Sequence, residues 1–95
     1  MVAAFRPSLS LNLSVTTTSA SAALIGIGAH IRVVNAGTTP CYVALHDGSG
    51  SASTATGMLM LGNTVEVFSR GDRTHIAAIT ASGTTTLNVT TGEGL

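Results

Sequence analysis

The chain has 95 residues, and its four arginines are balanced by four carboxylates, so the formal net charge is zero. Charged residues make up 8% of the chain, against about 25% in ordinary globular domains. Disordered chains combine low hydrophobicity with high net charge, whereas this chain is 44% hydrophobic. The composition therefore excludes disorder, and the length predicts one domain over residues 1–95.

Several partners and compartments are also disfavoured by the composition. A membrane-spanning helix needs about 20 apolar residues, and the longest apolar run, 20–29, is interrupted by Ser21, Gly26 and Gly28. The first seven residues lack the basic and apolar regions of a secretory signal. Nucleic acid is a poor partner, because the four cations are matched by four anions and only three aromatic residues could stack on bases. We expect neither a membrane nor a nucleic-acid partner.

Strand signals dominate the chain. Residues 9–15 alternate strictly between apolar and polar, which predicts a half-buried strand, and residues 16–19 make a polar link. The run 19–27 offers at most one short helical turn, limited by Gly26 and Gly28. Further strands are expected at 31–35, which ends at the turn cluster 35–37, and at 41–46.

The second half of the chain continues this pattern after a long loop. Residues 47–57 lack a large apolar side chain and predict a flexible loop. Residues 58–61 return to the core, and further strands are expected at 64–69, 74–80 and 84–90. The whole pattern predicts an all-β fold, a small antiparallel β-sandwich or barrel of six to eight short strands. Residues 11–14 and 87–90 resemble one another, which indicates either two strands paired at a sheet edge or a coincidence in a Thr-rich chain.

The histidines are the candidates for chemistry. Nucleophilic catalysis would need a serine held by His46 or His75 and a carboxylate such as Asp47 to orient the ring. No Gly-x-Ser-x-Gly motif occurs. A metal site would need three or four converging ligands, which His30, His46 and His75 could supply only by meeting in space or around a trimer axis. We expect no enzyme activity, no cofactor and no metal, and leave the role of the three histidines open.

Three shorter features have plain structural interpretations. The single cysteine, Cys41, excludes an internal disulfide and is expected to pack as a small hydrophobic residue. Arg70-Gly71-Asp72 matches an adhesion tripeptide, but a charged hairpin tip is the better interpretation. The sequons at Asn12 and Asn88 lie in predicted strands and are interpreted as polar strand faces.

The scarcity of charge favours association. Thr occurs 15 times, Ser 10 times and Ala 13 times, so hydroxyls and methyl groups must cover much of the surface. A near-neutral surface promotes association, and a small sandwich must protect its edge strands or bury them in partners. We expect a homo-oligomer, in which residues 1–7 form an N-terminal arm that places Val2, Phe5 and Arg6 against a neighbour; a frayed terminus is the alternative.

Three segments resemble a family of small virion proteins of tailed bacteriophages. They are 31–37 leading into 40–44, then 62–68, and a closing part made of 74–79 with 87–94. With their linking turns they cover about two-thirds of the chain. The resemblance implies a structural protein without a catalytic motif. It suggests a decoration or cement protein, with a trimer favoured, that binds the major capsid protein on the outer capsid surface after assembly in the host cytoplasm. The alternative is a tail or fibre module that binds a receptor glycan, for which Tyr42 is the aromatic candidate.

Overall fold

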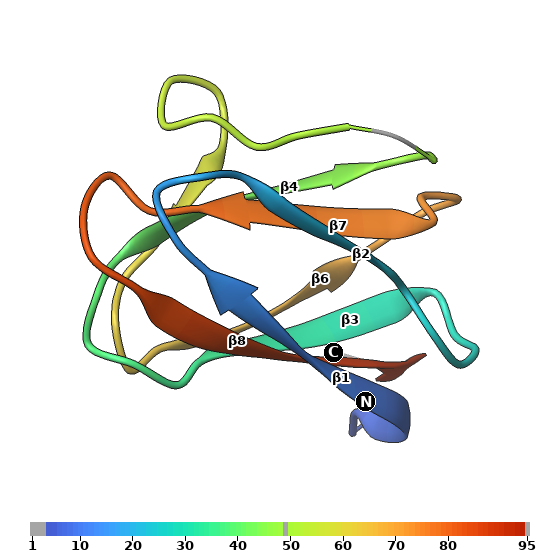
Figure 1. Cartoon of the computed structure of the whole chain (residues 1–95). Coiled ribbons are helices and arrows are strands. Elements are labelled where there is room, and N and C mark those ends of the chain that lie inside the picture. The colour runs from blue at the N-terminus through green and yellow to red at the C-terminus, as the bar shows by residue number, and fades with distance from the viewer. Residues whose placement is uncertain (1–3, 49, 95) are drawn as a thin grey trace.

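Eight antiparallel strands form two four-stranded sheets that pack face to face (Figure 1). The computed structural model describes residues 4–48 and 50–94. The strands are β1 (Arg6–Val15), β2 (Ala20–Ala23), β3 (His30–Asn35), β4 (Cys41–His46), β5 (Met58–Met60), β6 (Val65–Ser69), β7 (His75–Ile79) and β8 (Thr85–Glu93). Sheet A has the order β1-β8-β3-β6 and sheet B the order β2-β7-β4-β5. The predicted all-β sandwich is confirmed, with eight strands.

The core lies between the two sheets and follows the alternation of each strand. In β3 every second residue is buried, and in β1 the same holds for Leu13 and Val15. The first half of β1 departs from the prediction, because a bulge between Pro7 and Ser10 shifts the register and leaves Leu9 54% exposed. The main core cluster consists of Leu13, Val15, Ile31, Val33, Cys41, Val43, Met60, Ile76, Ala78, Leu87 and Val89.

The two similar segments near the ends of the chain are paired strands. β1 and β8 are antiparallel neighbours, with Leu11 opposite Val89 and Leu13 opposite Leu87, and β1 is the edge of sheet A. Residues that face each other across an antiparallel pair lie on the same face of the sheet. The shared pattern therefore places the apolar residues of both strands toward the core, so coincidence was the wrong alternative.

The segment expected to make a short helical turn is a strand. Ala20–Ala23 pairs with β7, with Ala20 opposite Ala78. The two glycines that follow have positive φ angles, 82° at Gly26 and 119° at Gly28. Pairing with β7 satisfies the backbone groups that a helix would otherwise satisfy, so tertiary context overrides the helical preference of alanine. No helix in the described part of the chain is long and apolar enough to cross a membrane.

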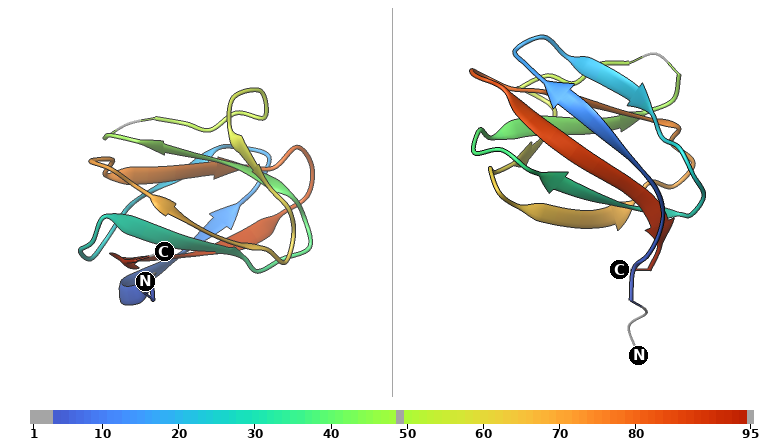
Figure 2. Two further views of the ribbon diagram at one scale, coloured as in Figure 1. Left: turned by 180° about the vertical axis from the view of Figure 1, so that it is seen from behind. Right: turned by 60° about the horizontal axis from the view of Figure 1, so that its bottom comes forward.

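The long loop after β4 lies against the outer face of sheet B (Figure 2). Ala77 points to this outer face, since its register partners Ser21 and Ala44 alternate with inward-facing residues, yet it is fully buried. The loop supplies the cover: Ala52 is 5% exposed and its N–H donates to the Ser19 hydroxyl over 2.9 Å. Flexibility of residues 47–57 stays a prediction, but part of this loop is packed onto the sandwich.

A buried asparagine joins the turns at one end of the two sheets. The Nδ2 group of Asn35 donates to the carbonyls of Thr39 (2.9 Å) and Leu61 (3.2 Å). Its Oδ1 accepts from the Gly37 N–H over 3.2 Å and from the Thr85 hydroxyl. Asn35 is fully buried, and the sequence identified it only as part of a turn cluster. Its side chain connects the β3–β4 turn, the end of β5 and the start of β8.

Candidate functional site

Two of the three histidines meet on the outer face of sheet B. His46 in β4 and His75 in β7 are register partners, and their rings stack with centroids 5.4 Å apart and planes inclined by 19°. The Nε2 of His46 lies 3.0 Å from the Ser21 hydroxyl on β2. His30 lies on β3 of the other sheet, where its Nδ1 accepts from the Gly94 N–H over 3.4 Å. The expected chemistry candidates thus yield one serine–histidine pair and no meeting of all three rings.

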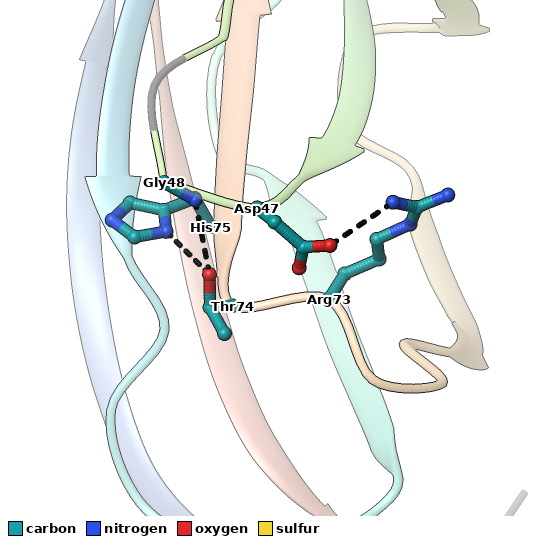
Figure 3. A network of polar contacts seen from close by, with 5 residues as sticks. All are labelled: Asp47, Gly48, Arg73, Thr74 and His75. Carbon is teal, nitrogen blue, oxygen red and sulfur yellow. Dashed lines mark hydrogen bonds and ion pairs between the residues drawn. The ribbon is translucent and has the colours of Figure 1, made fainter.

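The serine–histidine pair lacks the third member of a catalytic triad. The Nδ1 of His46 is buried and has no hydrogen-bond partner among residues 4–48 and 50–94. Asp47, the neighbouring carboxylate, is turned toward Arg73 and pairs with it at 3.2 Å (Figure 3). A triad needs a carboxylate on Nδ1 to fix the tautomer and stabilise the imidazolium. Within the described residues, no group of three His, Cys, Asp or Glu side chains could hold a metal ion.

The hydroxyl of Thr74 fixes the position of His75 and the start of the long loop (Figure 3). It lies 2.7 Å from Nδ1 of His75 and accepts the Gly48 N–H over 3.3 Å. These contacts, with the Asp47–Arg73 pair, tie the β4 end of the loop to the turn that precedes β7. The polar cluster therefore holds the start of the long loop against the turn that precedes β7, at one end of sheet B.

The other sequence candidates have structural positions. Cys41 is fully buried in the core as expected, and burial raises the pKa of its thiol. The Arg70–Asp72 tripeptide lies in the exposed turn between β6 and β7. Because β6 belongs to sheet A and β7 to sheet B, this turn crosses between the sheets, and the expected hairpin was wrong.

The expected assembly residues lie at the start of sheet A. Phe5 is half-buried and packs on Gly92: a Cβ atom added at Gly92 would lie 2.8 Å from Phe5 Cζ. Arg6 begins β1 and is opposite Glu93 in register, and Pro7 also belongs to β1. Val2 lies outside the described residues. The arm expected over 1–7 thus includes two residues of β1, and contact with a neighbour stays a prediction for all three positions.

Four exposed apolar side chains lie on the edge strands β5 and β6 and on the turn that joins them. Met58, Leu59, Leu61 and Val65 are 45%, 53%, 57% and 48% exposed. We call these four residues the β5–β6 patch. The sequence pattern predicts that 58–61 lies in the core, but only Met60 of that segment is buried. Side chains alternate along a strand, so Met58 and Leu59 face opposite sides of β5, and this was the signal that the segment 58–61 cannot be wholly buried.

Three of the four edge strands, β1, β5 and β6, carry features that oppose pairing with other strands. β1 contains Pro7 and a bulge, and β5 has three residues. In β6, Glu66 is opposite the buried Val33 and therefore projects from the core-facing side of an edge strand. Proline, bulges, short strands and inward-pointing charges are the usual protections of exposed edges. Contacts through side chains are consequently favoured over edge-to-edge hydrogen bonding.

Comparison with known proteins supports the fold class. No family model and no curated protein matches the chain. A structure titled "Crystal structure of PirA" has a TM-score of 0.59 and 11% identity, over 85% of this chain and 91% of that chain. A structure from Bacillus endospore appendages, described as a novel family of disulfide-linked pili, has a TM-score of 0.53 and 14% identity, over 87% of this chain and 80% of that chain. At these identities the likeness is one of fold, and this chain is a small all-β sandwich protein.

Proposed function

We propose that this chain is a non-enzymatic structural protein that assembles with copies of itself and decorates the outer capsid surface of a tailed bacteriophage. In this proposal it forms a trimer, binds the major capsid protein and is assembled in the host cytoplasm. The observation that carries the assembly step is the β5–β6 patch. The resemblance of segments 31–37 with 40–44, 62–68, and 74–79 with 87–94 to phage virion proteins supports the capsid as the partner.

The β5–β6 patch has the character of a contact surface. Exposed apolar surface on a small protein marks sites of association. Leu59 and Leu61 of the patch line one hollow together with Tyr42, and the segment 58–69 contains one charged residue, Glu66. Burying such side chains gains about 25 cal/mol for each Å² of apolar surface removed from water. Repeated weak contacts to many coat subunits would add through multivalency. The patch therefore offers a physical basis for both self-association and shell binding.

The similar fold in a pilus subunit supports the idea that such a sandwich can serve as a building block. That protein is described as forming disulfide-linked pili. The present chain has a single cysteine, Cys41, and it is fully buried in the core. A disulfide between copies would require the core to open, so we propose non-covalent association through the apolar patch.

Analytical ultracentrifugation of the purified chain tests self-association. We expect the wild type to sediment as a trimer and the Leu59→Ser/Leu61→Ser double variant to sediment as a monomer. Leu9→Ser is the matched control, because Leu9 is 54% exposed but lies on β1, and it should leave the trimer unchanged. A monomeric wild type, or a double variant that remains trimeric, would contradict the role of the β5–β6 patch.

Quantitative mass spectrometry of purified virions of the source phage tests the capsid assignment. Decoration requires a copy number on the order of the number of coat subunits, since the site repeats over the shell. A handful of copies would place the chain in the tail or portal and would overturn the capsid assignment while leaving self-association standing. Absence from the virion would overturn it as well.

The alternative function is a tail or fibre module that binds a receptor glycan through Tyr42. Its supporting observation is a shallow hollow where Tyr42 lies beside the hydroxyl residues Thr39 and Ser82 and the apolar Leu59 and Leu61. Sugar sites combine an aromatic face with polar groups. A glycan array tests this alternative: binding that is lost in Tyr42→Ala would support it, and an array without binding would exclude it.

A further inference from the structure

The open outer face of sheet A carries a continuous row of polar side chains across three strands. Ser10 of β1, Thr90 of β8 and Arg32 of β3 are successive register partners. Beside this row, Asn12 of β1 is opposite Asn88 of β8. Register partners lie on one face, and the inward alternation of Ile31 and Val33 places Arg32 on the outside. This face therefore presents hydroxyl, amide and guanidinium groups together.

These polar groups surround a hollow. It is lined by Phe5, Pro7, Ser10, Arg32, Asn88 and Thr90. Gly92 lies on the same face of β8, two residues beyond Thr90, and has no side chain to fill the space. The Phe5 ring packs over Gly92 and forms one wall. The hollow thus has an aromatic wall at one end and a polar floor.

Arg32 has no charged partner in the described part of the chain. It is half-buried on β3, and the ion pair found in residues 4–48 and 50–94 joins Arg73 to Asp47. Glu66 lies on the opposite face of sheet A, since it faces Val33 in register. The carboxylate of Glu93 accepts the Ala29 N–H over 2.9 Å. A half-buried guanidinium retains five N–H donors, and here they are directed to no carboxylate.

The neighbouring side chains form an ordered chain of hydrogen bonds. The Thr90 hydroxyl donates to Asn88 Oδ1 over 3.4 Å, so the Ser10 hydroxyl, 2.7 Å from Thr90 Oγ1, must donate to it. Asn88 Nδ2 donates to Asn12 Oδ1 over 2.9 Å. Ser10 Oγ is then left as an acceptor, and Asn88 Nδ2 keeps a second N–H to donate. The hollow consequently offers fixed partners for hydroxyl groups that both donate and accept.

We propose that this hollow binds a carboxylate-bearing sugar, a hexuronic acid unit. Arg32 pairs with the carboxylate in the forked geometry typical of arginine. Asn88 and Ser10 bond to the sugar hydroxyls, and the Phe5 ring packs against the apolar face of the pyranose. Neutral sugars would leave Arg32 unpaired. The inference goes beyond the assembly proposal and does not rest on it, because no residue of the β5–β6 patch lines the hollow.

An acidic peptide fits this hollow less well than an acidic sugar. The centre of a protein–protein interface is apolar and aromatic, whereas here the apolar residues Phe5 and Pro7 stand at one end and the floor is polar. Nucleic acid would need several cations, and the hollow contains one. The combination of one guanidinium, one ring and several hydroxyl partners therefore favours the sugar.

Titration with trigalacturonic acid, followed by ¹H–¹⁵N NMR of the full chain, tests the proposal. We expect saturable shifts at the amides of Arg32, Asn88 and Thr90. The fully methyl-esterified trisaccharide keeps the shape but loses the charge, and it should bind about ten- to a hundredfold more weakly, the factor that charge-assisted hydrogen bonds carry. Equal binding of ester and acid, or no binding of the acid, would overturn the proposal.

Matched variants locate the site and separate it from the assembly. Arg32→Gln should reduce affinity by about the same factor as esterification, and Phe5→Leu should weaken binding of the acid and the ester alike. Arg73→Gln removes the same charge from the β6–β7 turn and should leave binding unchanged. The NMR spectrum of each variant reports folding directly. Unchanged affinity in Arg32→Gln would refute sugar recognition, and so would tighter binding of a penta-glutamate peptide than of the sugar. Sedimentation of the same samples measures assembly independently of sugar binding.

Discussion

Replacing Asn35 by alanine should destabilise the sandwich far more than replacing any exposed asparagine. The side chain is fully buried and makes hydrogen bonds to Gly37, Thr39, Leu61 and Thr85. The substitution removes the partner that Asn35 gives to the Gly37 N–H, the Thr39 carbonyl and the Thr85 hydroxyl, whereas the Leu61 carbonyl still accepts from the Thr64 hydroxyl over 2.6 Å. Because these groups come from the β3–β4 turn, the end of β5 and β8, the loss weakens the connection between both sheets.

The magnitude follows from counting the groups that water cannot easily reach. The Leu61 carbonyl keeps its hydrogen bond from the Thr64 hydroxyl, whereas Thr85 is buried and Gly37 and Thr39 are half-buried. Leaving a buried polar group unsatisfied costs about 1–3 kcal/mol. For three such groups, one of them fully buried, we expect a loss of about 3–5 kcal/mol. In a domain of this size that corresponds to a decrease in Tm of at least about 12 °C.

Urea denaturation of wild type, Asn35→Ala and Asn12→Ala provides the measurement. Asn12 is exposed and its side chain accepts one hydrogen bond, from Asn88 over 2.9 Å, so its variant should lose less than about 1 kcal/mol. Asn35→Asp should be at least as destabilising as Asn35→Ala, since it buries a charge against two carbonyls. If Asn35→Ala lost no more than Asn12→Ala, the reasoning about the buried network would be refuted.

Three further predictions concern the core, a close backbone approach and the surface ion pair. Burial raises the pKa of the Cys41 thiol, so the folded state keeps this proton at a pH where the unfolded state releases it. The free energy of unfolding should therefore fall as the pH rises past about 8.5. Denaturation of Cys41→Ala over the same pH range should show no such fall. Gly28→Ala should lower the free energy of unfolding by more than about 2 kcal/mol, because the added Cβ would overlap the Gly92 carbonyl. Gly71→Ala should lower it by about 1 kcal/mol, since Gly71 has a φ of 59° but open space around it. Equal losses in the two variants would show that the overlap at Gly28 is relieved. Arg73→Ala should lower the free energy of unfolding by less than about 1 kcal/mol, since the pair with Asp47 is exposed. A larger loss in thermal unfolding would contradict the small energetic contribution expected of an exposed pair.

Local alternation was enough to predict most strands, because the period of two is a property of the strand itself. It predicted the strands at 31–35, 41–46, 64–69, 74–80 and 84–90, and the eight-stranded sandwich lies within the expected range. It failed at Ala20–Ala23, where alanine has no strand preference of its own and β7 supplies the pairing. It also failed in the first half of β1, where the bulge redirects Leu9 toward solvent.

The surface sites could be predicted less well than the fold, since they depend on which strands become neighbours. The sequence identified Arg32 only as a residue of a strand, and the hollow around it exists because β1, β8 and β3 are adjacent in sheet A. The same holds for the β5–β6 patch: Met58, Leu59 and Leu61 were expected in the core, and Val65 only as a residue of a strand. His46 and His75 were separate candidates in the sequence, and only the pairing of β4 with β7 stacks their rings.

The sequence by itself determined that this is one neutral, charge-poor, all-β domain, because composition and alternation are local properties that require no partner strand. The tertiary structure alone decided which faces remain open. It covers sheet B with the long loop, protects the edge strands, and leaves the polar face of sheet A and the β5–β6 patch at the surface. These outcomes depend on strand order and register, which join residues far apart in the chain, and no local pattern encodes that pairing.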